Sequence, residues 1–254
     1  MVERDRDMST NPPVKLIRWL NFVQFCLLPG ICVVCQRPSC LHRDLCQRCE
    51  AVLPRVCGPC PGCALPLPPG RPANTLCGKC TMRRPVWTTV APFCWQAEII
   101  PLVSGFKYRQ NLAAGRVLGQ VLETVLRDVY RDSPLPELLL PVPLHTSRLQ
   151  ERGYNQALLL ARQLGATFDI PVNPQVLQRV RSTPPQQGLN AIQRRQNLRG
   201  AFAVADASAL NDISRIALID DVITTMTTLR MLALELGRAS AAPLEIHAWA
   251  LARA

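Results

Sequence analysis

The sequence predicts an α/β protein in which a small metal-held domain precedes a larger domain with a mostly parallel sheet. Two observations predict this arrangement. Eleven of the twelve cysteines fall between Cys26 and Cys80, which indicates a separate module held by metal ions. After about Trp87 cysteine nearly vanishes, and strand and helix patterns alternate, which favours a parallel sheet with helices on both faces. A chain of 254 residues is long enough for both parts.

The first predicted element is an amphipathic helix near the N-terminus. The stretch from Val14 to Gly30 has apolar residues at helical spacing, and Pro29 and Gly30 end it. Its polar face carries only Lys15 and Arg18, so packing against the body of the protein is favoured over binding to a membrane surface. We therefore expect three parts, namely the N-terminal helix, a cysteine-rich domain and an α/β domain, at residues 1–30, 31–84 and 85–254.

The cysteine-rich domain carries four CxxC pairs. Ten residues separate the first pair from the second, and thirteen separate the third from the fourth. Two CxxC turns supply four thiolates, which suit a tetrahedral zinc ion with no open coordination position and therefore a structural role. Eight ligands make two zinc sites, joined either sequentially as a double zinc ribbon or in a cross-braced order: Cys32/Cys35, Cys46/Cys49, Cys60/Cys63 and Cys77/Cys80.

Two alternatives stay open for these cysteines. The eight can be scattered structural thiols, and Cys57, Cys40 or His42 can replace one of the ligands. Disulfides are disfavoured, because the expected location is the cytoplasm, where thiols stay reduced.

Charge and hydropathy limit the class of protein. No run of 18 uncharged apolar residues occurs, so no membrane span is expected. Glu3, Asp5 and Asp7 precede the first apolar stretch, unlike the basic start of a secretory signal, and this predicts a cytoplasmic protein. The net charge of +11 at pH 7 suits a polyanionic partner, such as nucleic acid or a phosphorylated metabolite.

Strand and helix patterns divide the α/β domain into elements. Strands are predicted at 86–95, 137–144, 215–220 and 243–252, the third of them central. Helices are predicted at 112–130, 155–165 and 227–237, and a short helix or turn with a basic loop at 101–109. Pro141 is expected to end or kink its strand, and Gly165 and Gly237 to cap their helices. In such a sheet the binding site lies beyond the carboxyl ends of the strands.

The segment after the central strand combines two acids with a turn rich in threonine. Asp220 and Asp221 can accept strong hydrogen bonds from two vicinal hydroxyls of a ribose. The free N–H groups of the next helix can bind an anion such as a 5′-phosphate, and hydroxyls add donors. The residues therefore predict a ribose 5-phosphate site that includes Thr224, Thr225, Thr227 and Thr228. Direct binding of Mg²⁺ by the acids and simple helix capping by threonine are the alternatives.

The same segment resembles a known motif. Ile216–Thr228, IALIDDVITTMTT, looks like the 5-phosphoribosyl-1-pyrophosphate (PRPP) motif of type I phosphoribosyltransferases, in which two acids and two spacers precede T-T-G-x-T. From about Ile31 onward the chain is similar to the ComF/GntX family, in which a double zinc ribbon precedes a type I phosphoribosyltransferase-like domain. Three further segments carry this likeness: FKYRQ (Phe106–Gln110), PVPLHTSRLQERGYNQALLLAR (Pro141–Arg162) and RVRSTPPQQGLNAIQRRQNLRGAF (Arg179–Phe202).

The resemblance implies roles for individual residues. It implies that Asp220 and Asp221 hold the ribose of PRPP, bound with Mg²⁺, and that Lys107 and Arg109 meet the pyrophosphate. These four residues are the catalytic candidates, and the PRPP-binding candidates are Asp220, Asp221, Thr224, Thr225, Met226, Thr227 and Thr228.

Met226 departs from the motif, because the family has glycine there, which permits positive φ and lets the backbone approach phosphate. Either Met226 weakens PRPP binding, with a backbone cost of roughly 1 kcal/mol or more, or it keeps an ordinary helical φ and points away.

A basic segment precedes the central strand. Between Asp169 and Asp206 no acid occurs, and arginines alternate with amide side chains, which suits a phosphate chain. A solvated charged face is the alternative. The DNA-binding candidates are Arg152, Arg181, Arg194, Arg195 and Arg199.

The resemblance implies a function in DNA handling. It implies single-stranded DNA as a partner, during natural transformation or DNA utilisation, together with proteins of DNA uptake. As an enzyme, the protein would transfer ribose 5-phosphate from PRPP to an acceptor. The alternative is a non-enzymatic, zinc-ribbon, nucleic-acid-binding adaptor with a degenerate PRPP site. Nucleobase salvage is disfavoured, because no aromatic hood for a base is visible in the sequence.

Overall fold

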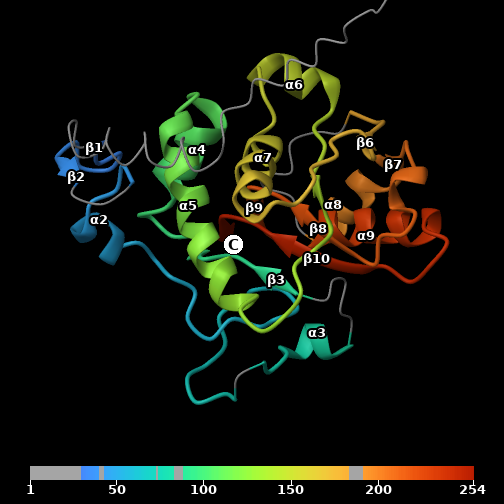
Figure 1. Ribbon diagram of the computed structural model, residues 1–254, viewed down its shortest axis with the longest axis horizontal. Helices are drawn as coiled ribbons and strands as arrows, with labels where there is room; N and C mark the ends of the chain where they lie inside the picture. The colour runs from blue at the N-terminus through green and yellow to red at the C-terminus, as the bar shows by residue number, and fades with distance from the viewer. Residues whose placement is uncertain (1–29, 40–42, 73, 83–87, 183–190) are drawn as a thin grey trace, which may run out of the picture. The chain divides into compact units, whose positions relative to one another are not determined.

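The computed structural model describes residues 30–39, 43–72, 74–82, 88–182 and 191–254 (Figure 1). The chain divides into two compact units, Met1–Ala51 and Val52–Ala254. The division follows the second CxxC pair, so two pairs fall in each unit. The predicted helix at 14–30 lies outside the described residues except for Gly30.

The first unit contains a short antiparallel ribbon and a short helix. β1 (Gly30–Ile31) pairs with β2 (Pro38–Ser39), and α2 (Gln47–Ala51) follows. The buried hydroxyl of Ser39 donates to the carbonyl of Leu45 at 3.1 Å. This bond ties the ribbon to the segment that enters α2.

The two halves of the cysteine-rich segment are built in the same way. Gln36 follows the first CxxC pair and Ala64 follows the third, and both have a left-handed backbone, with φ of 60° and 56°. The amide of Gln36 donates to the carbonyl of Cys32 at 2.9 Å, and the amide of Ala64 donates to that of Cys60 at 2.7 Å. The second and fourth pairs each lead into a short helix, α2 and α3 (Gly78–Met82). The segment is therefore an internal repeat of a tight turn followed by a helix.

A four-stranded parallel sheet forms the centre of the second unit. Its strand order is β3-β10-β8-β5, and every neighbouring pair is parallel. The predicted central strand is β8, which lies between two partners and is buried after its first residue. The α/β prediction is thereby confirmed. The strands are β3 (Thr89–Val90), β5 (Leu138–Pro141), β8 (Arg215–Ile219) and β10 (Glu245–Trp249).

Three of these strands break and then continue. The continuations form a second parallel sheet of order β4-β11-β9, which repeats the order β3-β10-β8. The predicted strands at 86–95 and 243–252 are therefore each interrupted within the described residues. The break after β8 falls at Asp220 and Asp221. The continuing strands are β4 (Phe93–Cys94), β9 (Val222–Ile223) and β11 (Ala252–Arg253).

Helices cover both faces of the sheet, because alternate strand residues point to opposite sides. Leu218 of β8 belongs to the core that contains Leu232 of α9. On the other face, the Trp249 ring packs against the rings of Tyr130 and Phe168, at the ends of α5 and α7, with centroid distances of 5.5 and 6.1 Å. The helices described in this part are α4 (Ile100–Tyr108), α5 (Leu112–Val129), α6 (Thr146–Arg152), α7 (Gln156–Phe168), α8 (Ala191–Leu198) and α9 (Thr227–Ala239), with a 3₁₀ turn, η1 (Ser208–Leu210).

The third and fourth CxxC pairs share a core with the sheet. Cys60, Cys63 and Cys80 are buried in the same hydrophobic cluster as Leu218 and Leu232. The segment that carries the third and fourth CxxC pairs and the α/β fold of this unit are therefore stabilised by one set of apolar contacts.

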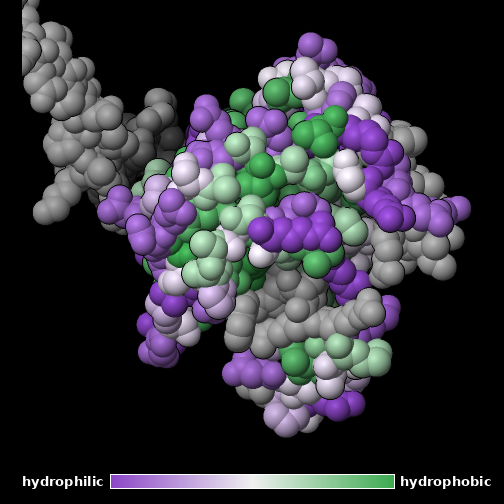
Figure 2. All heavy atoms as spheres, turned by 90° about the vertical axis from the view of Figure 1, so that its right-hand side faces the viewer, coloured by the Kyte–Doolittle hydropathy of each residue, from purple (hydrophilic) through white to green (hydrophobic). Residues whose placement is uncertain are grey.

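A pair of antiparallel strands that the sequence analysis did not predict flanks α9. Its strands are β6 (Leu177–Arg179) and β7 (Phe202–Val204), and the Arg179 guanidinium lies 5.7 Å from the centroid of the Phe202 ring. The side of the molecule that carries β6, β7 and α9 faces the viewer in Figure 2, where hydrophilic side chains surround a smaller hydrophobic area. Residues 183–190 of the basic segment lie outside the described residues.

Two predicted helix ends are wrong. Helix α7 continues past Gly165, and α9 continues past Gly237. Gly165 serves close packing instead, since a Cβ atom there would lie 2.6 Å from Cγ2 of Val172 and 2.7 Å from the carbonyl oxygen of Ile170. The glycine therefore lets the segment after α7 return close to the helix.

We predict that Gly165→Ala lowers the free energy of unfolding by about 1–3 kcal/mol, because the backbone at Ile170 must move to admit a methyl group. Gly237→Ala is the matched control in a helix, where a Cβ atom meets nothing within 4 Å, and it should raise stability by about 0.5–1 kcal/mol. Urea unfolding followed by circular dichroism measures both changes. Equal effects of the two substitutions would contradict the packing role of Gly165.

Candidate functional site

Two groups of four cysteines can each hold a metal ion. In each group the sulfur atoms all lie within 4.8 Å of one another. The Sγ atoms of Cys35 and Cys46 are 3.8 Å apart, and those of Cys63 and Cys77 are 3.7 Å apart. A tetrahedron with zinc–sulfur bonds of about 2.3 Å has sulfur–sulfur edges of about 3.8 Å, so the spacing fits zinc. The groups are Cys32, Cys35, Cys46 and Cys49 in the first unit, and Cys60, Cys63, Cys77 and Cys80 in the second.

This grouping joins the CxxC pairs sequentially. The cross-braced order and the scattered-thiol alternative do not fit it. Cys57 belongs to neither group, since it is exposed and its Sγ lies 3.9 Å from the carbonyl of Arg55. Cys40 and His42 lie outside the described residues. Four thiolates leave no open coordination position, so a metal held by either group has a structural role.

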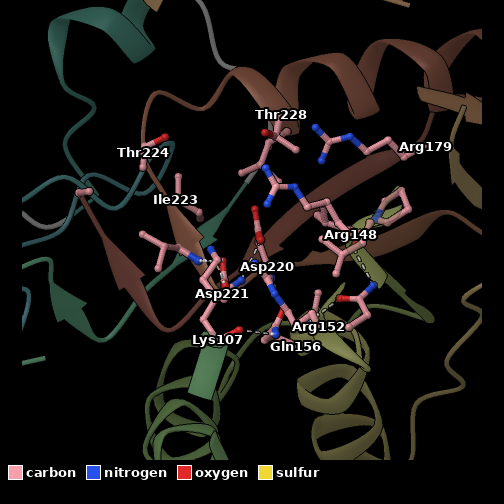
Figure 3. A pocket seen from close by; sticks show the side chains of 18 of the residues that line it. Lys107, Arg148, Arg152, Gln156, Arg179, Asp220, Asp221, Ile223, Thr224 and Thr228 are labelled. Carbon is pink, nitrogen blue, oxygen red and sulfur yellow. Dashed lines mark hydrogen bonds and ion pairs between the residues drawn. The ribbon is translucent and has the colours of Figure 1, made fainter. Parts of the chain in front are cut away.

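A cavity of about 670 Å³ lies at the carboxyl ends of β5 and β8. Its lining includes residues of α4, the segment from β5 through α6, the start of α7, β6, the break after β8 and the first turn of α9. Figure 3 shows the charged side chains that these elements direct into it. The cavity occupies the place predicted for a binding site in an open parallel sheet.

Asp221 and Lys107 form an ion pair in this cavity. The Nζ atom of Lys107 lies 3.0 Å from Oδ1 and 2.8 Å from Oδ2 of Asp221, which is only 6% exposed. The carboxylates also bind the backbone of the break. Oδ1 of Asp220 accepts from the amide of Asp221, and Oδ1 of Asp221 accepts from the amide of Val222, both at 2.8 Å. Lys107 is distant from the acids in the sequence, and the fold brings it to them.

The turn before α9 carries the predicted threonines. Thr224, Thr227 and Thr228 line the cavity, and Thr225 is not among the lining residues. The hydroxyl oxygens of Thr225 and Thr227 are 2.7 Å apart. Three of the four predicted hydroxyl residues therefore meet Asp220 and Asp221 around one space.

Met226 holds the position immediately before α9 in a left-handed backbone conformation, with φ of 62° and ψ of 5°. The alternative that it keeps an ordinary helical φ is therefore wrong. Its side chain is 5% exposed and packs in the core while lining the cavity. Burial of this side chain offsets a backbone cost of about 1–2 kcal/mol. The side chain of Met226 makes no capping hydrogen bond to the first amides of α9.

Three arginines line the cavity, namely Arg148, Arg152 and Arg179. In Figure 3, Arg148 and Arg179 extend from the same side towards Asp220 and Thr228. The sequence analysis did not propose Arg148 as a site residue. The signal that identifies it is its place just after a buried strand whose carboxyl end was predicted to face the site.

Arg152 contacts Gln156 and Tyr108 at the cavity wall. Its Nη1 donates to Oε1 of Gln156 at 2.7 Å, and its guanidinium lies 5.1 Å from the centroid of the Tyr108 ring. Asn155 precedes the next helix, α7, and its Oδ1 accepts from the amide of Ala157 at 3.0 Å. Asn155 is therefore a helix cap.

Of the remaining predicted site residues, those whose side chains the structure describes do not line the cavity. Arg109 is exposed at the end of α4 and is not among the lining residues. Arg181 donates to the carbonyls of Asn197 and Arg199, at 2.8 and 2.6 Å, so it fastens the end of α8. Arg199 is exposed. The side chains of Arg194 and Arg195 lie outside the described part of the structure.

Burial changes the ionisation of Asp220. Burial raises the pKa of Asp220 to about 7, and the negative charge of Asp221 acts in the same direction. Lys107 opposes both effects. Burial by itself lowers the pKa of Lys107, but the charge of Asp221 outweighs it, so this pKa lies above its ordinary value. The cavity therefore holds one firm ion pair and one carboxyl that titrates near neutral pH.

Comparison with known proteins identifies relatives of this chain. Competence protein F of Haemophilus influenzae is 39% identical over 181 residues, which cover 70% of this chain and 78% of the relative. The chain belongs to the ComF/GntX family. A second relative is DNA utilization protein YhgH of Salmonella typhi. It is 30% identical over 231 residues, which cover 89% of this chain and 98% of the relative.

No protein-family model matches this ComF/GntX chain. Among solved structures, adenine phosphoribosyltransferase from Leishmania donovani is 19% identical, with a TM-score of 0.33, and the match covers 53% of this chain and 64% of that one. Within the described residues of the ComF/GntX protein, no helix has both the length and the apolar character needed to cross a membrane.

We predict that Asp220→Asn raises the melting temperature more at pH 8 than at pH 5. The pKa of Asp220 is higher in the folded state than in the unfolded chain, so the native state loses stability as pH rises from about 4 to about 7. Asparagine cannot ionise, and the gain should be larger at pH 8 by on the order of 2 kcal/mol. Thermal unfolding without PRPP or added Mg²⁺ measures it. The exposed Asp132→Asn is the control, and an equal gain at both pH values would contradict the assignment.

Proposed function

We propose that this ComF/GntX-family protein binds PRPP, or a related ribose phosphate, in the cavity beside Asp220 and Asp221. The observation that carries the proposal is that the acidic pair and the first turn of α9 line one cavity. Ribose hydroxyls need acceptors, and a 5′-phosphate needs N–H and hydroxyl donors at a short distance from them. The break after β8 supplies the acceptors, and the turn that follows supplies the donors.

The acids and the threonines bind different parts of the ligand. Asp220 and Asp221 accept hydrogen bonds from the two ribose hydroxyls, and Lys107 holds Asp221 in an ion pair. The first amides of α9, with Thr227 and Thr228, bind the 5′-phosphate. The left-handed backbone at Met226 supports this role, because it keeps the turn in the conformation that glycine adopts in the family motif.

The basic side of the cavity suits the pyrophosphate of PRPP. Among the described residues, Lys107, Arg148, Arg152 and Arg179 line it together with two carboxylates, Asp220 and Asp221. A planar guanidinium can donate two parallel hydrogen bonds to phosphate oxygens. The role of Arg109 at the pyrophosphate stays a prediction, since that residue is exposed at the end of α4.

Mg²⁺ fits the donor set of this cavity. Carboxylate oxygens with substrate phosphates are its usual partners in proteins, and Asp220 and Asp221 supply the carboxylates. When bound, the ion neutralises charge on the pyrophosphate. The residues of the chain orient the ligand, and Lys107 holds Asp221 in place.

We also propose that the protein binds single-stranded DNA and acts in DNA uptake or DNA utilisation. The names of its relatives support this, since one is a competence protein and another is a DNA utilization protein. The net charge of +11 favours a polyanion. Arg152, Arg194, Arg195 and Arg199 are the proposed phosphate contacts, whereas Arg181 is already bound to two carbonyls.

Ligand binding without turnover is a second candidate function, and Met226 favours it. In a transferase, the bond between C1 of the ribose and the pyrophosphate breaks, and a new bond joins C1 to the acceptor. Met226 brings a side chain to the cavity wall where the family motif has none. The protein would then serve as a nucleic-acid-binding adaptor that responds to a ribose phosphate.

We predict that PRPP with Mg²⁺ binds the wild-type protein and that Asp221→Asn weakens binding at least about tenfold. A hydrogen bond to a charged group contributes about 1.5–3 kcal/mol, and this change removes the charge that meets a ribose hydroxyl. Isothermal titration calorimetry measures the affinity, with Asp132→Asn as the control of equal chemistry. No heat from either the wild type or Met226→Gly would exclude PRPP. Pyrophosphate release by Met226→Gly alone would support binding without turnover in the natural protein.

DNA binding should depend steeply on salt. We predict that the logarithm of the affinity for a single-stranded oligonucleotide falls linearly with the logarithm of salt concentration, and that Arg194→Ala with Arg195→Ala lowers the slope by about 1.4. Fluorescence anisotropy at several salt concentrations measures this. The control is the pair Arg131→Ala and Arg238→Ala, which are exposed arginines in helix ion pairs. The same slope for both double variants would place the DNA elsewhere.

A further inference from the structure

Arg253 lies between the second cysteine quartet and the turn that leads into α9. It belongs to β11 and is only 7% exposed. Its Nε donates to the carbonyl of Cys63 at 2.7 Å. Its Nη1 donates to the carbonyl of Ile223 at 3.1 Å and also to that of Thr224. One buried guanidinium therefore joins a metal ligand to a residue that lines the cavity.

The backbone between Cys60 and Cys63 is held by the sheet. The carbonyl of Pro61 accepts from the amide of Thr89 at 2.7 Å, and the carbonyl of Gly62 accepts from the hydroxyl of Thr89 at 3.1 Å. Arg253 binds the next carbonyl, that of Cys63. Three consecutive carbonyls of the third CxxC turn are thus bound by β3 and β11. A metal ion that orders this turn also orders the carbonyl to which Arg253 donates.

The same strand holds the other side of the connection. In the β9–β11 ladder Arg253 is paired with Ile223, and the amide of Ala254 donates to the carbonyl of Ile223 at 2.8 Å. The amide of Leu251 donates to the carbonyl of Asp221 at 3.1 Å. Strand β11 therefore supports the path of the chain from Asp221 to Thr224, and a shift of Arg253 changes that path.

The charge at the second cysteine quartet makes the position of the Arg253 guanidinium depend on the metal ion. A buried guanidinium is stable only with acceptors and with negative charge nearby. Four thiolates around a divalent ion keep a net negative charge, and Arg253 is placed beside one of these ligands. Bonds to a metal ion would fix Cys60 and Cys63, so the geometry of the third CxxC turn depends on the ion.

We propose that Arg253 is a positioning residue that couples metal binding at the second quartet to the geometry of residues 222–228. Loss of metal from Cys60, Cys63, Cys77 and Cys80 then weakens binding of a ribose phosphate, whereas loss from the first quartet does not. The ligand in this statement rests on the function proposed above. The coupling itself concerns the backbone and is measured without any ligand.

The first quartet offers a matched control. It holds the same four ligands in the same repeated turn, but it lies in the unit Met1–Ala51, whereas the turn before α9 lies in Val52–Ala254. Removing two ligands from either quartet is the same chemical change. Only the second quartet has a described bond to Arg253.

The first experiment compares Cys32→Ser/Cys35→Ser with Cys60→Ser/Cys63→Ser in the full chain. Metal content is measured by mass spectrometry, and each double variant should lose one of two zinc ions. Hydrogen exchange of the amides at 222–228 should speed up at least about tenfold only in the second variant, and its PRPP affinity should fall at least about tenfold. Equal exchange and equal affinity in the two variants would overturn the coupling.

The second experiment keeps both metal centres and changes the link. Arg253→Met retains the apolar stem without the donors, and Arg253→Lys restores one cation. Arg253→Met should keep two zinc ions, speed up exchange at 222–228 and weaken PRPP binding at least about tenfold, with partial recovery in Arg253→Lys. Unchanged exchange in Arg253→Met, with zinc retained, would overturn the proposal even if the Cys60→Ser/Cys63→Ser variant fails to fold. If the wild type binds no PRPP, PRPP is not the ligand. The hydrogen-exchange data then decide by themselves whether metal binding and residues 222–228 are coupled.

Discussion

The break in the central strand at Asp220 and Asp221 is the constraint on which the candidate site depends. A broken strand leaves backbone groups without a ladder partner, and buried groups of this kind must be satisfied locally. The two carboxylates bind the amides of Asp221 and Val222, and the carbonyl of Asp221 accepts from the amide of Leu251. The acids therefore close the break and line the cavity at the same time. Lys107 balances the charge that this arrangement buries.

The second metal centre and the cavity belong to one structural unit. Cys60 and Cys63 pack in the core that also contains Met226, and Arg253 binds both the third CxxC turn and the turn before α9. Met226 itself occupies a left-handed position that disfavours a side chain, and the same core buries it. Packing, metal binding and the shape of the candidate site therefore depend on shared contacts. This sharing explains how a turn with unfavourable backbone geometry persists.

Sequence patterns identified the elements whose character comes from burial along one chain segment. The periodicity of α5 and the apolar run of β8 are local signals, and both elements were predicted correctly. Glycine was interpreted wrongly at Gly165 and Gly237, because a glycine near a helix end can cap the helix or admit a neighbour. At Gly165 the neighbour is the backbone of Ile170, which no local pattern reveals. The β6–β7 strand pair was missed for a related reason, since its two strands are separated by the basic segment.

The sequence by itself determined the cysteine ligand types, the parallel α/β class, the family resemblance and the acid–threonine segment, because these follow from residue identity at short spacing. Tertiary structure alone decided how the CxxC pairs join, that Lys107 pairs with Asp221, and that Arg148 and Arg179 enter the cavity. It also decided that Arg253 reaches the third CxxC turn. The Lys107–Asp221 pair and the positions of Arg148 and Arg179 depend on which segments meet at the carboxyl edge of the sheet. The strand order determines which segments lie together there, and no single segment of the sequence specifies the strand order.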